Sequence, residues 1–153
     1  MEISEILAPE RISCDVVVNS KKAALETLAG MIAETDAELT QAEVFESFIA
    51  REKLGSTGLG NGIAIPHGRQ KGSTKTIGAF MRLNIGISYD AVDQKPVDLL
   101  FALLVPEEST EAHLQILSML AQMFSEPETL VKFRECESVE QIFKLLTNTE
   151  NTD

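Results

Sequence analysis

The residues with the clearest capacity for chemistry lie in one glycine-rich stretch, residues 51–69, which reads REKLGSTGLGNGIAIPHGR. It holds two arginines, one of the two histidines of the chain and five of its nine glycines. Glycines at this spacing can reach positive φ and can turn backbone N–H groups toward an anion. A cation, a donor-rich loop and an imidazole together indicate phosphate chemistry on His67.

His67 is the candidate nucleophile, because a useful fraction of imidazole is uncharged near neutral pH. Arg51 is the candidate phosphate-stabilising cation. The loop residues that could contact phosphate are Gly55, Ser56, Thr57, Gly58, Gly60 and Asn61. An ordinary alternative stays open for each: a loop-edge histidine, a solvated helix-end cation and simple turn residues. The stretch matches neither the GxxxxGK[ST] phosphate loop nor the GxGxxG dinucleotide fingerprint.

The second histidine, His113, falls in the first turn of a helix predicted over about 110–124, with Ser109 as its N-cap. It could support His67, or it could be a histidine at the edge of the core. Arg69 could be an outer cation of the site or an ordinary surface residue. Two histidines without a third close ligand make a weak case for a metal, and no cofactor is expected.

The elements that must position these residues alternate between helix and strand. Apolar spacing and capping residues predict helices over about 3–7, 21–34, 41–54, 110–124, 127–134 and 139–146. Strands are predicted at 16–18, 63–65, 77–83 and 97–105, with a further short strand at 87–89. The run 97–105 is apolar except for Asp98 and is bounded by prolines, which predicts a strand covered on both faces. The pattern predicts a three-layer α/β fold, with a mixed β-sheet flanked by helices on both faces.

Length and composition limit the number of domains and the classes of partner that are expected. The chain has 153 residues, which predicts a single domain over 1–148 and a polar tail at 149–153. Its net charge of −11 argues against nucleic acid or an anionic membrane surface as a partner. No apolar run is long enough for membrane insertion, and the N-terminus lacks a signal-peptide pattern. Cys14 and Cys136 have no metal-binding spacing and fit free thiols in the cytoplasm.

Two runs carry a family resemblance. Residues 51–58 and the run GNGIAIPHG at 60–68 resemble the active-site signature of the fructose/mannitol-type IIA domains of the bacterial phosphotransferase system. The sequence of the second run is most similar to the nitrogen-regulatory branch of that family. Residues 90–106 and the segment from His113 to Ser118 are also similar to that branch, so the resemblance covers nearly the whole chain.

The resemblance implies that His67 accepts a phosphoryl group on Nε2 from an HPr-like phosphocarrier, which an Enzyme I homologue charges. Arg51 matches the family's arginine near the phosphohistidine, and His113 matches its second active-site histidine. Arg69 stands where a lysine is expected. The chain would be a cytoplasmic phosphoprotein with transferase activity, and its phosphorylation state would control nitrogen regulation and targets such as potassium-transport components.

Two other functions stay open. The chain could be a IIA component that passes phosphate to a separate fructose- or mannitol-type sugar permease. It could also be a non-enzymatic regulatory module whose histidines are structural.

Overall fold

The computed structural model of the chain describes residues 2–108 and 111–148. The predicted N-cap Ser109 and the predicted tail 149–153 lie outside these ranges. Within them, no helix is both long enough and apolar enough to span a bilayer. The helices are α1 (Ile3–Ile6), α2 (Lys21–Glu34), α3 (Gln41–Glu52), α4 (Glu111–Met123), α5 (Pro127–Glu135) and α6 (Val139–Asn148), with a short 3-10 turn η1 (Pro9–Arg11). The strands are β1 (Ile12–Val16), β2 (Gly58–Gly60), β3 (Ile63–Ala64), β4 (His67–Gln70), β5 (Ile77–Ile87) and β6 (Val97–Pro106).

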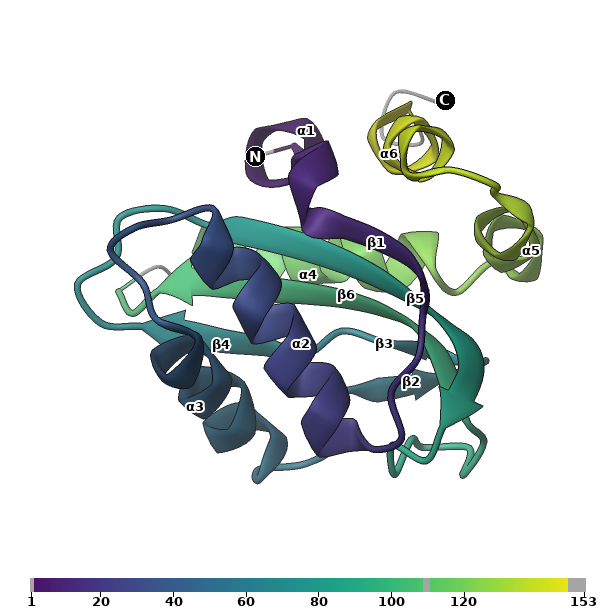
Figure 1. Cartoon of the computed structure of the whole chain (residues 1–153), viewed down its shortest axis with the longest axis horizontal. Coiled ribbons are helices and arrows are strands. Elements are labelled where there is room, and N and C mark those ends of the chain that lie inside the picture. Colours follow the sequence, from purple (N-terminus) through teal and green to yellow (C-terminus); the bar gives the residue numbers. More distant parts are fainter. Residues whose placement is uncertain (1, 109–110, 149–153) are drawn as a thin grey trace.

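The strands form one mixed sheet in the order β1-β5-β6-β3-β2, with β4 also paired to β6 (Figure 1). Strands β5 and β6 are antiparallel, whereas β1 runs parallel to β5, and both β3 and β4 run parallel to β6. β3 and β4 pair with successive parts of β6, because Ala64 lies opposite Leu100 and His67 opposite Leu103. His67 is therefore the first residue of a strand whose position the central strand fixes.

Helices cover both faces of the sheet, which confirms the predicted three-layer α/β fold (Figure 1). Helices α2 and α3 pack on one face, around Leu25, Leu28 and Phe48. Helices α1, α4, α5 and α6 pack on the other, around Ile6, Leu120, Leu130 and Ile142. β6 is buried between the two cores, as its apolar sequence predicts. Along β5 the alternation separates one core from the other, since Ala79 and Met81 face the first and Phe80 faces the second.

The prediction for the first strand is wrong in position. The β-branched run Val16–Val18 predicts a strand there, but β1 spans Ile12–Val16 and Val17 is 71% exposed. Pairing with β5 decides the strand's place, because Ile12 and Ser13 align with Phe80 and Met81. The register that buries Ile12, and not local β-propensity, determines where the strand lies.

Strand β2 was not predicted, because its glycine-rich sequence is typical of a loop. The three residues Gly58–Gly60 pair antiparallel with β3. The predicted short strand at 87–89 was also wrong, since β5 continues without a break to Ile87. In both places pairing with a neighbouring strand decides the conformation, and composition alone does not contain that information.

Helix α3 delivers Arg51 to the site, and its start is fixed by the predicted capping residue. The Thr40 hydroxyl accepts a hydrogen bond from the Glu43 N–H at 3.2 Å, which satisfies one free donor of the first turn. From that start, Val44 and Phe48 point into the core. The helix ends at Glu52, so Arg51 lies in the last turn, beside the sheet edge that carries His67.

Gly68 allows α3 to approach β4 closely. A Cβ at this position would lie 2.7 Å from the backbone carbon of Ser47 and 2.8 Å from its carbonyl oxygen. Backbone atoms of a packed helix cannot move aside cheaply, so any side chain at Gly68 would push α3 away from the sheet.

We therefore expect Gly68→Ala to destabilise the protein by about 1–3 kcal/mol, the usual cost of overpacking. Urea unfolding followed by circular dichroism measures this difference. Gly30→Ala is the matched control. Gly30 lies inside α2, where alanine is the better helix former, and a Cβ there meets only the flexible side chain of Gln41 at the start of α3. Equal stability of Gly68→Ala and the unsubstituted protein would contradict the packing argument.

Candidate functional site

Three residues from three elements meet at the edge of the sheet formed by β4. Arg51 comes from the last turn of α3, His67 from the first position of β4 and His113 from the first turn of α4. The Arg51 Nε–H donates to Nε2 of His67 at 3.2 Å. The centroids of the two imidazole rings are 5.6 Å apart, and the rings are inclined at 52°. The fold thus brings together the three side chains that the sequence analysis singled out.

The hydrogen bonds of His67 define which of its nitrogens can react. Nδ1 lies 2.9 Å from the carbonyl oxygen of Ile65, and a carbonyl oxygen can only accept. Nδ1 therefore carries the proton and donates it to that carbonyl. Nε2 then holds the free lone pair, which accepts from Arg51. The nucleophilic atom of the neutral ring is Nε2.

Burial favours the uncharged form of both imidazoles. It is the largest cause that lowers the pKa of His67, and the charges of Arg51 and Arg69 lower it further. The bond to Ile65 and the charge of Glu52 act in the opposite direction. The pKa of His113 is also lowered, first by burial and then by His67 and Arg69. A neutral His67 is the form that can act as a nucleophile.

This pKa shift predicts how the site responds to acid. The NMR titration midpoint of the His67 ring protons should lie below about 6.5, the ordinary value for histidine. Nε2 then stays unprotonated, and reactive, until the pH falls to the lowered midpoint. The folded state binds fewer protons than the unfolded state between the two pKa values, so acidification through this window also reduces stability. A midpoint above about 6.5 would show that the imidazolium is favoured instead.

The three side chains line an open pocket of about 680 Å³. Two further cations, Arg69 and Lys71, line the same pocket. α3 contributes Glu43, Glu46 and Ala50 to the wall of the pocket, and Leu54, just after the helix, adds a further apolar group. The pocket is therefore large enough for a phosphoryl group together with a side chain of a donor molecule, and cations lie near the reactive nitrogen.

His113 contributes a polar atom without a partner. His113 is only 5% exposed, and its buried Nδ1 has no hydrogen-bond partner among the described residues. Buried polar atoms are almost always paired, so an unpaired one at a pocket calls for an explanation. A group that enters the pocket and exchanges a hydrogen bond with His113 would supply it.

The hydroxyl residues of the glycine-rich loop bond within the protein. The Ser56 hydroxyl donates to the carbonyl oxygen of Tyr89 at 3.0 Å and accepts from the Gly58 N–H at 3.1 Å. The Thr57 hydroxyl and N–H both donate to the Glu52 carboxylate. Both residues hold the loop in shape, and neither lines the pocket around His67.

The glycines and Asn61 are likewise placed by the fold. The Gly55 carbonyl accepts from Nη1 of Arg51 at 2.8 Å, and the Asn61 N–H donates to the Asp93 carboxylate at 2.9 Å. Gly58 and Gly60 belong to β2, and a Cβ on Gly58 would lie 2.9 Å from the Ala91 Cα. Gly55 is thus bonded to a pocket residue, Arg51. Direct contact between the loop and phosphate stays a prediction.

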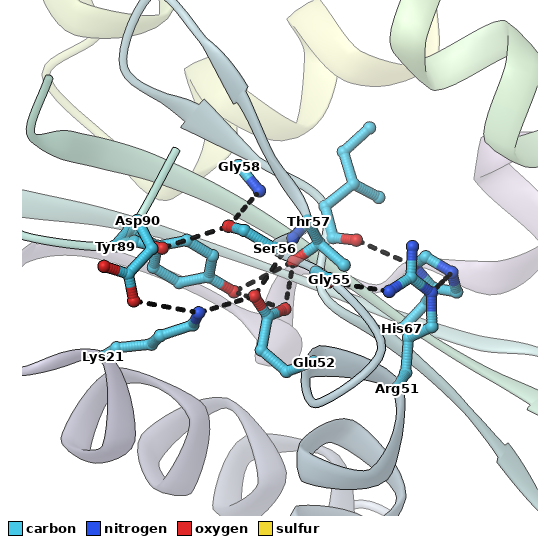
Figure 2. Close-up of polar contacts among 11 residues, drawn as sticks. Lys21, Arg51, Glu52, Gly55, Ser56, Thr57, Gly58, His67, Tyr89 and Asp90 are labelled. Atoms are coloured by element: carbon cyan, nitrogen blue, oxygen red, sulfur yellow. Dashed lines mark hydrogen bonds and ion pairs between the residues drawn. The ribbon is translucent and has the colours of Figure 1, made fainter. Parts of the chain in front are cut away.

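Sequence reasoning missed Glu52. The residue is 9% exposed and bonds to Thr57, Tyr89 and Lys21 beside the loop (Figure 2). A signal was available, because Val44, Phe48 and Glu52 are spaced four residues apart and share the buried face of α3. A carboxylate on the apolar stripe of a helix needs buried partners.

Comparison with known proteins identifies the family. The family model described as "Phosphoenolpyruvate-dependent sugar phosphotransferase system, EIIA 2" matches residues 5–149. The chain belongs to this family. The phosphotransferase system type-2 EIIA domain therefore accounts for nearly the whole sequence, and the resemblance carried by the His67 stretch is confirmed.

Several of the similar proteins are nitrogen regulatory proteins. The chain is 40% identical to the nitrogen regulatory protein of Pseudomonas aeruginosa over 151 residues, which is 99% of this chain and 98% of that protein. It is 41% identical to the Escherichia coli K12 nitrogen regulatory protein, covering 99% and 93% respectively. The crystal structure of the nitrogen regulatory protein IIA-Ntr from Neisseria meningitidis superposes with a TM-score of 0.90 at 45% identity, covering 95% of this chain and 99% of that one.

Proposed function

We propose that this chain is a phosphocarrier and regulatory protein that accepts a phosphoryl group on Nε2 of His67 from an HPr-like phosphocarrier. One observation carries the proposal. The Ile65 carbonyl holds the proton of His67 on Nδ1, which leaves the Nε2 lone pair available beside the Arg51 guanidinium. Membership of the type-2 EIIA family supports the phosphoryl-transfer chemistry.

The proposed step needs no proton transfer at His67. As the phosphorus–nitrogen bond of the donor phosphohistidine breaks, a bond forms between phosphorus and Nε2, and the donor imidazole leaves with the electron pair. Nδ1 keeps its proton and its bond to Ile65. Arg51 then turns from the lone pair to an oxygen of the phosphoryl group, where its positive charge stabilises the charge spread over the transferring oxygens. His113 would give the phosphoryl group a second hydrogen-bond partner.

The regulatory part of the proposal rests on where the charge appears. A phosphoryl group adds up to about two negative charges at pH 7. Exposed Leu54 lines the same pocket, and exposed Leu114 follows His113 on α4. A target protein that docks on Leu54 and Leu114 would therefore meet a different surface charge in the phosphorylated and the unphosphorylated protein. Cytoplasmic targets such as potassium-transport components fit this role.

The proposal is tested by reconstitution. The chain, phosphoenolpyruvate, an Enzyme I homologue and its HPr-like carrier are incubated together, and intact mass is measured before and after acid treatment. We expect one acid-labile phosphoryl group per chain, which appears only when the carrier is present. No mass increase in the complete mixture would refute the proposal. Rapid onward transfer to a fructose- or mannitol-type permease component would instead favour the transport function.

A further inference from the structure

The buried carboxylate of Glu52 is bound from four directions. Its Oε1 accepts from the hydroxyls of Thr57 and Tyr89, the latter at 3.4 Å. Its Oε2 accepts from the Thr57 N–H at 3.0 Å and lies 2.7 Å from Nζ of Lys21. The Lys21 ammonium in turn lies 4.7 Å from the centroid of the Tyr89 ring. Figure 2 shows this cluster beside the loop that joins α3 to β2, with Arg51 and His67 on the other side of that loop.

The Lys21 and Glu52 side chains are 23% and 5% exposed, and an ion pair so largely removed from water is weak evidence of a stabilising role. Removing two charges from water is costly, and an apolar group of similar volume often stabilises a fold as well or better. The Glu52 cluster encloses residues 53–56 between the end of α3 and Thr57, and so it fixes the conformation of a short loop. The question is what that conformation serves.

Two chains of hydrogen bonds run from this loop to the reacting side chains. In the first, the Gly55 carbonyl accepts from Nη1 of Arg51 at 2.8 Å, which leaves the Arg51 Nε–H directed at His67. In the second, the Thr57 carbonyl accepts from the Ile65 N–H at 3.0 Å. The Ile65 carbonyl then accepts from Nδ1 of His67 at 2.9 Å. One chain orients the cation, and the other orients the nucleophile.

We propose that Glu52 is a positioning residue for phosphoryl acceptance, because it anchors the loop that orients both Arg51 and His67. Glu52 itself contacts neither the pocket nor the phosphoryl group. The expected kinetic effect of Glu52 rests on the proposed function. Its structural effect, on the orientation and tautomer of His67, can be measured without any phosphoryl donor.

The decisive variant is Glu52→Gln. The amide has one acceptor oxygen where the carboxylate has two. If its NH₂ group takes the place of Oε2, it faces the Thr57 N–H and Lys21 Nζ, which cannot accept. If NH₂ takes the place of Oε1, it can only donate to the Thr57 and Tyr89 hydroxyls, so both of those bonds must reverse direction. In both orientations the carboxylate charge is lost and bonds that anchor the loop are reversed or broken, while side-chain volume is kept. Thr57→Val is a milder second variant, because it removes the hydroxyl and leaves the N–H bond to Glu52 in place.

We expect Glu52→Gln to lower kcat for acceptance from the phosphorylated carrier about 10- to 100-fold, as a misplacement of about 1 Å can do. The KM for the carrier should be unchanged, since Glu52 does not line the pocket. Thr57→Val should fall between this variant and the unsubstituted protein. Glu26→Gln is the control for charge loss, because Glu26 is an exposed carboxylate on α2. It should leave both constants unchanged.

NMR of the imidazole nitrogens supplies the readout that loss of stability alone would not change. In the unsubstituted protein the His67 shifts should report a single neutral tautomer with the proton on Nδ1, and in Glu52→Gln a mixture of tautomers. A folded Glu52→Gln protein with unchanged nitrogen shifts overturns the positioning role. If the unsubstituted protein accepts no phosphoryl group, the proposed function fails, and the nitrogen shifts still decide whether Glu52 positions His67.

Discussion

Replacing His67 with glutamine is expected to abolish phosphoryl acceptance, with a loss of at least roughly 10³-fold, as removal of a nucleophile does in other enzymes. Glutamine can still accept a hydrogen bond from Arg51, and its size is similar. Its amide nitrogen, however, has no available lone pair with which to attack phosphorus. Incubation with the phosphorylated carrier, followed by intact-mass measurement, determines the residual rate.

His113→Gln is the informative companion to this variant. It removes the second imidazole of the pocket and leaves Nε2 of His67 in place, so the protein should still take up one phosphoryl group, although more slowly. Circular dichroism of both variants checks that the fold is retained. Stable labelling of His67→Gln would assign the acceptor to another residue and would refute the account of the site.

Replacing Arg51 with alanine should give the second largest effect, a fall in the rate of acceptance of about 10²–10³-fold. Arg51 is the cation that contacts Nε2 directly, so its charge lies where the phosphoryl oxygens would pass. Arg51→Lys should retain part of the rate, because it keeps the charge and loses the planar group that bonds His67 and Gly55 together. Rapid-quench kinetics with the phosphorylated carrier measures both variants.

Lys53→Ala is the matched control for Arg51. Lys53 is an exposed cation just after α3, and it lacks contact with the pocket. Its removal changes the net charge of the protein by the same amount as Arg51→Ala. If the two variants lost rate equally, the effect would come from the overall electrostatic field, and a specific role for Arg51 would be contradicted.

Local signals predict the helices of this fold well. The apolar set of α2 in the sequence, Ala24, Leu25, Leu28, Ala29 and Ile32, is the set of residues that is buried in the structure. The hydroxyls of Ser20 and Thr40 cap α2 and α3 as their positions predict. These features depend on residues within one or two turns of each other, so periodicity and capping chemistry contain them.

Pairing between distant strands explains what the sequence could not predict. Nothing near Gly58 indicates a strand, because β2 exists only where β3 offers it a partner. The strand at Val16–Val18 was misplaced for the same reason, since the register with β5 determines which residues of β1 are buried. A single sequence contains no direct record of such pairings.

The same difference between local signals and long-range contacts applies to the site. His67 and Arg51 lie close in the sequence, within one distinctive stretch, and their types indicate their chemistry. The proximity of His113 depends on α4 packing behind β6, which only the fold establishes. Glu52 was missed because its partners Lys21 and Tyr89 come from α2 and from the loop after β5, far from the glycine-rich stretch.

The central claim is that Nε2 of His67 is the phosphoryl acceptor. The most direct test is NMR of the uniformly nitrogen-15-labelled protein after phosphorylation by the HPr-like carrier, with nitrogen–phosphorus couplings measured for both histidines. The account predicts a coupling from phosphorus to Nε2 of His67, with Nδ1 of the same ring still protonated. A coupling to Nδ1 of His67, or to either nitrogen of His113, would contradict it.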